Sequence, residues 1–155
     1  VALDGTAVSV PNQALATVQS APAASKSIAI QAQASPAQAS GQTIEVPLIR
    51  LAWARSGDKG DTSNIGVIAR KPEWLAHLRA ELTEARVKDW LAHLVQGKVT
   101  RYEVPGIHAF NFVCEQALGG GGMASLRNDA LGKGMGQILL AMPVSVPAAW
   151  FPSEH

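Results

Sequence analysis

The chain has 155 residues, of which 47% are hydrophobic and 16% are charged, and its formal net charge is +1. This length suits one domain of ordinary size, but the charged fraction lies below the roughly 25% of a typical globular protein. The near-neutral balance excludes the basic field that non-specific nucleic-acid binding needs. No apolar run approaches the roughly 20 residues of a membrane-spanning helix. The sequence therefore predicts neither a nucleic-acid partner nor a membrane partner.

The low charge comes from residues 1–44, which differ from the rest of the chain. Ala, Gln and Ser fill 24 of these 44 positions, Asp4 and Lys26 are the only charged residues, and no aromatic residue is present. Such a segment cannot bury enough apolar surface to offset its conformational entropy. We therefore expect a largely disordered linker over 1–44 and a folded domain over 45–155. The chain begins at Val1, which indicates a piece of a longer protein.

The first half of the domain predicts two strands followed by two helices. Alternating apolar residues favour strands at 48–55 and 64–70, joined by a turn-rich loop at 56–61. Pro72 suits the first turn of a helix that continues to Leu82. Thr83 is placed to cap a second helix, which ends before Gly97. The apolar stripes of these elements lead us to expect three tryptophans in the core, namely Trp53, Trp74 and Trp90.

The second half predicts a strand at 99–104 and then a helix at 108–118. Phe110, Val113, Cys114 and Ala117 have the i, i+3, i+4, i+7 spacing of an amphipathic helix. Beyond the four glycines at 119–122, we expect strands at 125–128 and 137–146. This order of elements predicts the α+β class, as a ferredoxin-like sandwich in which helices cover one face of a mainly antiparallel sheet.

The densest polar cluster is the segment between the first two predicted strands. Its glycines free the backbone for a close ligand approach, its acidic residues can hold a cation or pair with the basic ones, and its amides can form an anion-binding nest. A hairpin connection with self-satisfied turns explains the same composition. The candidate ligand-binding residues here are Arg55, Ser56, Gly57, Asp58, Lys59, Gly60, Asp61 and Asn64.

Two further sets contain candidate binding residues. Arg101 shares a strand face with Glu103, where the two can form an ordinary surface ion pair or contact a ligand. Asn111 can orient a ligand or cap the predicted helix. After the glycines, Arg127 and Lys133 can clamp a carboxylate or a phosphate.

Cys114 is the only cysteine, which excludes an intrachain disulfide and fits a reducing, cytoplasmic location. Its place on an apolar stripe favours a buried thiol over a nucleophile. The histidines lack the spacing of a metal-binding motif. The sequence therefore assigns no metal, no cofactor and no catalytic residue.

Several motifs together resemble one known family. The segments 55–66 (RSGDKGDTSNIG), 99–105 (VTRYEVP), 111–113 (NFV) and 125–133 (SLRNDALGK) occur in the order found in AtuA-type acyclic terpene utilisation proteins. The resemblance covers about residues 46–147 and is to the C-terminal ferredoxin-like domain of that family. It implies an N-terminal AtuA-like domain as partner, in the same or a companion chain.

The resemblance also implies a context for function, namely the breakdown of citronellol and geraniol through CoA thioesters. Two roles follow as expectations. The domain is an accessory or assembly domain of an AtuA-like protein, which we favour for this chain. Alternatively, it is the substrate-binding or catalytic half of an enzyme acting on an acyl-CoA or related carboxylic acid. A homo-oligomer is expected in either case, and the segments above supply no assigned catalytic residue.

Overall fold

The computed structural model describes residues 41–152. The predicted linker lies outside these residues apart from its last four positions. None of the helices in the described part is long and apolar enough to cross a membrane.

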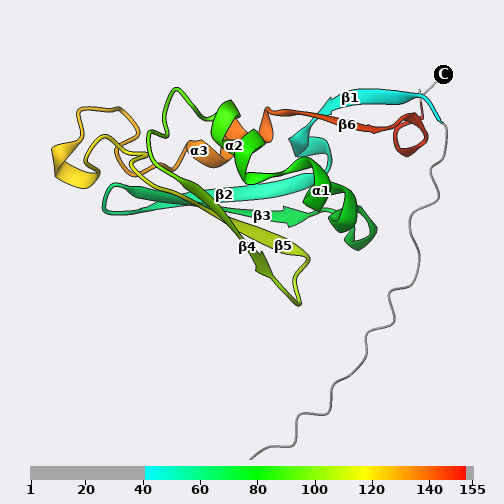
Figure 1. Ribbon diagram of the computed structural model, residues 1–155, viewed down its shortest axis with the longest axis horizontal. Helices are drawn as coiled ribbons and strands as arrows, with labels where there is room; N and C mark the ends of the chain where they lie inside the picture. Colours follow the sequence, from blue (N-terminus) through cyan, green and yellow to red (C-terminus); the bar gives the residue numbers. More distant parts are fainter. Residues whose placement is uncertain (1–40, 153–155) are drawn as a thin grey trace, which may run out of the picture. The chain divides into compact units, whose positions relative to one another are not determined.

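A four-stranded antiparallel sheet forms the centre of the domain (Figure 1). Its strands follow the spatial order β2-β3-β5-β4, and each neighbouring pair is antiparallel. The strands are β2 (Ala52–Lys59), β3 (Thr62–Ala69), β4 (Val99–Val104) and β5 (Ala109–Cys114).

Three short helices lie on one side of this sheet (Figure 1). A separate two-stranded ribbon pairs the N-terminal strand of the domain with its C-terminal strand. The helices are α1 (Leu75–Glu81), α2 (Glu84–Trp90) and α3 (Met135–Leu140). The ribbon pairs β1 (Thr43–Pro47) with β6 (Pro143–Pro147) in antiparallel register. The predicted α+β class, with an antiparallel sheet and helices on one face, is confirmed.

The hydrophobic core lies between the helices and the inner face of the sheet. Alternate residues of β3 and β5 point into it, because successive side chains of a strand point to opposite faces. Ile65, Val67, Phe110 and Phe112 are all fully buried there. The helices contribute the facing side of the core through Leu78, Val87 and Leu139. Leu82 and Leu91, which directly follow α1 and α2, are buried with them.

The segment predicted as a loop at 56–61 is mostly strand. β2 continues to Lys59 and pairs with β3 through a two-residue turn, Gly60-Asp61. Gly60 has φ +63°, a left-handed conformation that glycine adopts without steric cost. The polar residues 56–59 resembled a loop by composition, yet they alternate across the two faces of a hairpin.

The helix predicted at 108–118 is wrong, since residues 109–114 form strand β5. Phe110, Phe112 and Cys114 are buried at a spacing of two, so the strand period fits this segment as well as the helical one. The turn at 105–108, with Gly106 and His108 at positive φ, makes β4 and β5 a hairpin. That pairing decides the conformation.

Two predictions near the C-terminus are also wrong. Residues 125–128 form no strand, and the strand predicted at 137–146 is helix α3 followed by β6. In α3, Met135, Gly136, Leu139 and Leu140 are buried at helical spacing. Pro143 ends the helical region, because proline has no N–H to continue a helix.

The two helices predicted from Pro72 and Thr83 are present. The Thr83 hydroxyl accepts a hydrogen bond from the backbone N–H of Arg86 and so caps α2. Trp74 is buried, as expected, and stacks on Trp150 with 5.4 Å between ring centroids. The prediction that Trp90 is a core residue is wrong: its ring is partly exposed, and its indole Nε1 donates to the Ile138 carbonyl at 2.8 Å.

Cys114 is fully buried at the end of β5, on the core side of the sheet. Burial disfavours the charged thiolate and raises the pKa of the thiol from 9.0 to about 11, with an opposing contribution from the Lys88 ammonium. The thiol is therefore protonated at neutral pH and is a core side chain rather than a nucleophile.

The raised pKa of Cys114 predicts a loss of stability in alkaline solution. Above pH 9 the unfolded chain releases the thiol proton while the folded chain keeps it, so the free energy of unfolding falls until about pH 11. We expect Cys114→Ala to show a shallower decline than the unmodified protein between these pH values. Urea unfolding at several pH values measures this, and parallel declines for the two proteins would contradict it.

Candidate functional site: the open face of the sheet

The face of the four-stranded sheet opposite the helices is not covered by any described part of the chain. The strand register sets three rows of outward-facing residues across β2, β3, β5 and β4. The first row is apolar, the second contains a glycine between polar residues, and the third is mixed. In order, the rows are Trp53-Ile68-Ala109-Val104, Arg55-Gly66-Asn111-Tyr102 and Gly57-Asn64-Val113-Thr100.

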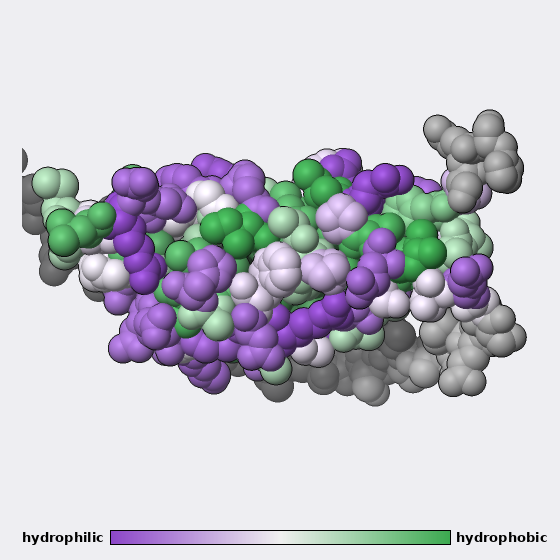
Figure 2. All heavy atoms as spheres, turned by 90° about the horizontal axis from the view of Figure 1, so that it is seen from above, coloured by the Kyte–Doolittle hydropathy of each residue, from purple (hydrophilic) through white to green (hydrophobic). Residues whose placement is uncertain are grey.

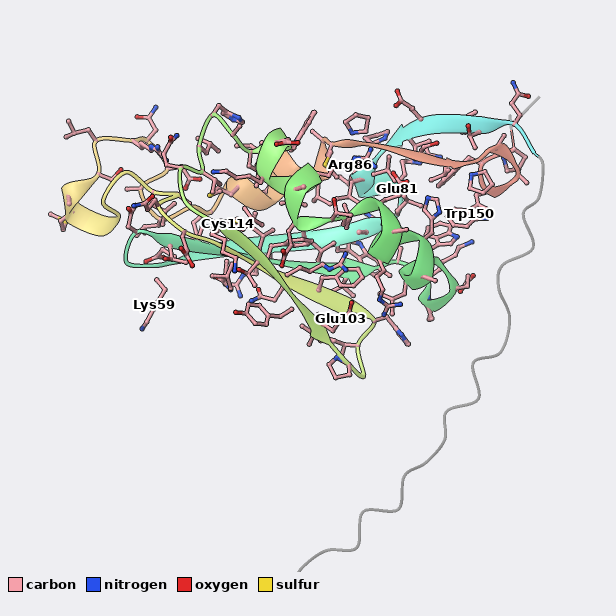
Figure 3. All side chains as sticks on the ribbon, viewed as in Figure 1. Lys59, Glu81, Arg86, Glu103, Cys114 and Trp150 are labelled. Atoms are coloured by element: carbon pink, nitrogen blue, oxygen red, sulfur yellow. The ribbon has the colours of Figure 1, made fainter. Side chains whose placement is uncertain are left out.

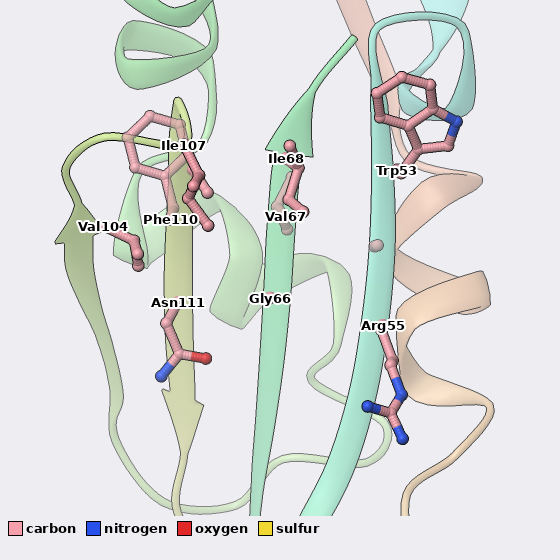
Figure 4. Close-up of a pocket in the computed structure, with 11 residues that line it drawn as sticks. Trp53, Arg55, Gly66, Val67, Ile68, Val104, Ile107, Phe110 and Asn111 are labelled. Atoms are coloured by element: carbon pink, nitrogen blue, oxygen red, sulfur yellow. The ribbon is translucent and has the colours of Figure 1, made fainter.

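The first row forms one end of an apolar hollow of about 380 Å³. Trp53, Ile68 and Val104 line it, together with Ile107 from the β4–β5 turn. Figure 4 shows these side chains at one end of the hollow, and Arg55 and Asn111 at the other. The prediction that Trp53 is a core residue is wrong, because the residue is 51% exposed. The Arg70 guanidinium lies 4.7 Å from the Trp53 ring centroid and covers part of it.

A second, polar hollow of about 320 Å³ adjoins the first. Asp58, Asn64 and Lys133 line it, and the two hollows share Arg55 and Gly66. The Lys133 ammonium lies 3.4 Å from the Asp58 carboxylate. Among residues 41–152, the Arg55 guanidinium makes neither an ion pair nor a hydrogen bond. The site therefore presents one unpaired cation where an apolar surface meets a polar one.

Gly66 forms the floor where the hollows meet. A Cβ added there would come no closer than 3.8 Å to any neighbouring atom, the Arg55 carbonyl oxygen. An added Cβ therefore meets no clash, and a larger side chain would extend into the hollow. The missing side chain creates space for a ligand rather than relieving strain.

The two hollows are lined by seven of the twelve predicted binding residues, of which Ser56 and Asp58 occupy inner-face positions of the edge strand β2. Gly57, Asp58 and Asn64 come from the β2–β3 hairpin, and Arg55 precedes them on β2. The more distant members are Asn111 on β5 and Lys133 in the segment before α3. Their role in binding stays a prediction.

Ser56 points to the opposite face, where it joins β2 to the start of α3. Its hydroxyl donates to the Gly132 carbonyl at 2.5 Å and accepts from the Gly136 N–H at 2.8 Å. Ser56 is buried, so these bonds replace contacts with water. This junction places Lys133 at the polar hollow.

Asp61 and Arg127 hold the glycine-rich loop instead of lining the hollows. The Asp61 carboxylate accepts from the N–H groups of Leu118 and Gly120, at 3.0 and 2.8 Å. The Arg127 guanidinium donates to the carbonyls of Ala117 and Leu94. Both predicted binding residues thus have internal partners.

Arg101 is also bound internally, on the helix side of β4. Its guanidinium donates to the carbonyls of Arg79 and Leu82, both at 2.7 Å. Glu103 pairs with Arg79 instead of Arg101, and the hydrogen bond from Arg79 lowers the pKa of Glu103. The remaining two candidates, Lys59 and Gly60, lie at the exposed end of the β2–β3 hairpin. Figure 3 labels Lys59 there.

Sequence reasoning missed the apolar part of this site. Trp53, Ile68 and Ile107 were not recognised, because an apolar residue in a strand is usually assigned to the core. The available signal was the two-residue turn at Gly60-Asp61, which pairs Arg55 with Gly66 and Trp53 with Ile68. Extending both strands to that turn would have placed these residues on one face.

The site shows no arrangement typical of a catalytic centre. Within residues 41–152, no group of three or more His, Cys, Asp or Glu side chains is placed to hold a metal ion. Cys114 faces the core, on the side of the sheet away from the hollows. What the geometry offers is binding of an anion next to an apolar group.

The glycine-rich loop generates a stability prediction. A Cβ at Gly121 would meet the Gly60 carbonyl oxygen at 2.0 Å, whereas a Cβ at Gly122 would meet nothing within 4 Å. Both glycines have positive φ, which costs alanine about 1–2 kcal/mol of conformational strain. Gly121 also has ψ 166°, a combination that essentially only glycine adopts. We expect Gly121→Ala to cost roughly 1–3 kcal/mol more than Gly122→Ala, through overpacking and this added backbone strain.

Urea unfolding of the two glycine variants measures this difference directly. Equal destabilisation would show that the contact between the loop and the β2–β3 hairpin does not hold the loop in place.

Comparison with known proteins identifies the domain. A family model for the AtuA ferredoxin-like domain matches residues 46–145, a range that includes the whole open face and the glycine-rich loop. No curated protein and no solved structure matches the chain. The match covers more than half of the chain and agrees with the motifs and with the antiparallel α+β architecture. The chain therefore belongs to the AtuA ferredoxin-like domain family.

Proposed function

We propose that this chain is a C-terminal accessory domain of an AtuA-type protein of acyclic terpene catabolism, acting in the breakdown of compounds such as citronellol and geraniol. In this role it docks on the N-terminal AtuA-like domain of the same or a companion chain. Membership of the AtuA family supports the context. The single observation that supports docking is the apolar tip of the glycine-rich loop.

This tip exposes large apolar side chains to solvent. Met123 and Leu126 are fully exposed, and Leu131 is about half exposed. In Figure 2, hydrophobic atoms gather at the end of the domain where the loop projects in Figure 1. Single exposed apolar residues are common on protein surfaces, but several on one projecting loop are typical of an interaction site.

The loop is also held in position before any partner binds. Asp61 binds the N–H groups of Leu118 and Gly120, and Gly121 packs closely against the Gly60 carbonyl. A fixed loop loses little conformational entropy on binding, so more of its contact energy contributes to affinity. This favours a docking surface over a loosely connected turn.

A second candidate function is substrate binding in an enzyme acting on an acyl-CoA or related carboxylic acid. The observation that favours it is the unpaired Arg55 guanidinium between the apolar and polar hollows. The two roles are compatible, because they use different surfaces of the domain. The homo-oligomer and the cytoplasmic location stay predictions from the sequence.

The docking proposal predicts that Met123→Ser with Leu126→Ser weakens association with the N-terminal AtuA-like domain at least about tenfold. Removing two apolar side chains from an interface costs more than the 1.4 kcal/mol that corresponds to this factor. Analytical ultracentrifugation or calorimetry of the two proteins measures the affinity. The same double variant is expected to slow growth on citronellol as the sole carbon source.

The matched control is Ile49→Ser, which removes an exposed apolar side chain away from the loop. It should leave both association and growth unchanged. Association of the double variant with wild-type affinity would contradict docking through the loop. Normal growth on citronellol after deletion of the whole domain would contradict the catabolic role.

A further inference from the structure

We propose that the open face of the sheet binds an aliphatic monocarboxylate, with its chain in the apolar hollow and its carboxylate on Arg55. This inference rests on the second candidate function and names the ligand class of that site. It does not depend on docking through the glycine-rich loop.

The apolar hollow fits a short aliphatic chain. Its walls are Trp53, Ile68, Val104 and Ile107, which present apolar surface. The Arg70 guanidinium beside the Trp53 ring donates to the Ile49 carbonyl at 2.8 Å. A hollow of about 380 Å³ lies within the roughly 300–1,000 Å³ range of small-molecule sites, which gives room for a short aliphatic chain. Placing such a chain there also covers the exposed part of the Trp53 ring, which is favourable because apolar surface leaves water.

The charges at the other end fit one negative group. Lys133 and Asp58 oppose each other at 3.4 Å, which leaves Arg55 as the uncompensated charge of the polar hollow. A guanidinium can bind a carboxylate through two parallel hydrogen bonds. A single uncompensated cation suits a monocarboxylate better than a diphosphate.

The order of residues along the face sets the direction of the ligand. Arg55 and Gly66 border both hollows, and Asn111 lies beside Gly66 in the same row of the sheet. The carboxylate therefore lies over this row, and the chain extends toward Trp53 and Ile107 (Figure 4). The Asn111 amide is available to donate a further hydrogen bond to the carboxylate.

The test compares three probes of the same chain length on the 155-residue protein. Calorimetry measures binding of octanoate, 1-octanol and octylammonium. We expect octanoate to bind at least about tenfold more tightly than 1-octanol, which corresponds to a charge-assisted hydrogen bond. Octylammonium is expected to bind more weakly than either, because its charge has the same sign as Arg55.

Two variants separate the roles of charge and shape. Arg55→Gln is expected to weaken octanoate binding at least tenfold and to change 1-octanol binding less than twofold. Gly66→Val fills the shared floor without a backbone clash and is expected to weaken both. The controls are Lys98→Gln, an exposed basic residue, and Thr100→Val on the same sheet face, both outside the two hollows. Both controls should bind all three probes as the unmodified protein does.

Several results would overturn the inference. One is equal affinity for octanoate and 1-octanol, and another is unchanged octanoate binding in Gly66→Val. Binding of octanoyl-CoA without binding of octanoate would overturn the ligand class while leaving the second candidate function standing. The protein could instead bind no octanoate and form a dimer that Gly66→Val dissociates. That result would assign the face to a second copy of the chain. If the unmodified protein binds octanoate but does not associate with the N-terminal AtuA-like domain, only the accessory role is refuted.

Discussion

The register of the β2–β3 hairpin is the constraint on which the other features depend. The turn at Gly60-Asp61 pairs Arg55 with Gly66 and Trp53 with Ile68, which places all four on the outer face. A slip by one residue would turn these side chains into the core and bring Ile65 and Val67 to the surface. The buried Ser56 hydroxyl secures the inner face, because it binds the carbonyl of Gly132 and the N–H of Gly136.

This register gives the two faces of one sheet different roles. The inner face packs against three helices and supplies the stability of the domain. The outer face is left with an apolar hollow, a polar hollow and a guanidinium between them. The glycine-rich loop projects from one end of the sheet and presents Met123 and Leu126 on a fixed backbone. Ligand binding and docking can therefore be assigned to separate surfaces of a small domain.

The sequence predicted the α+β class and the helices beginning at Pro72 and Thr83, and seven of its twelve candidate binding residues line the two hollows. It failed where the apolar residues of one segment fit both the helical and the strand period. The spacing of Phe110, Val113 and Cys114 is helical, yet pairing with β3 and β4 makes 109–114 a strand. It also failed where partners come from distant parts of the chain. Ser56, Asp61, Arg101 and Arg127 resemble binding residues by type, and only the folded chain brings backbone groups within reach of them.

The central claim is that the open face of the sheet is a binding surface, and chemical-shift mapping tests it most directly. Titration of octanoate into the isotope-labelled protein is predicted to shift the amide signals of Arg55, Gly66 and Asn111 and the indole N–H of Trp53. Signals from α1 and α2, on the opposite side of the sheet, should stay in place. Shifts confined to the helices or to the glycine-rich loop, or no shifts at all, would contradict the claim.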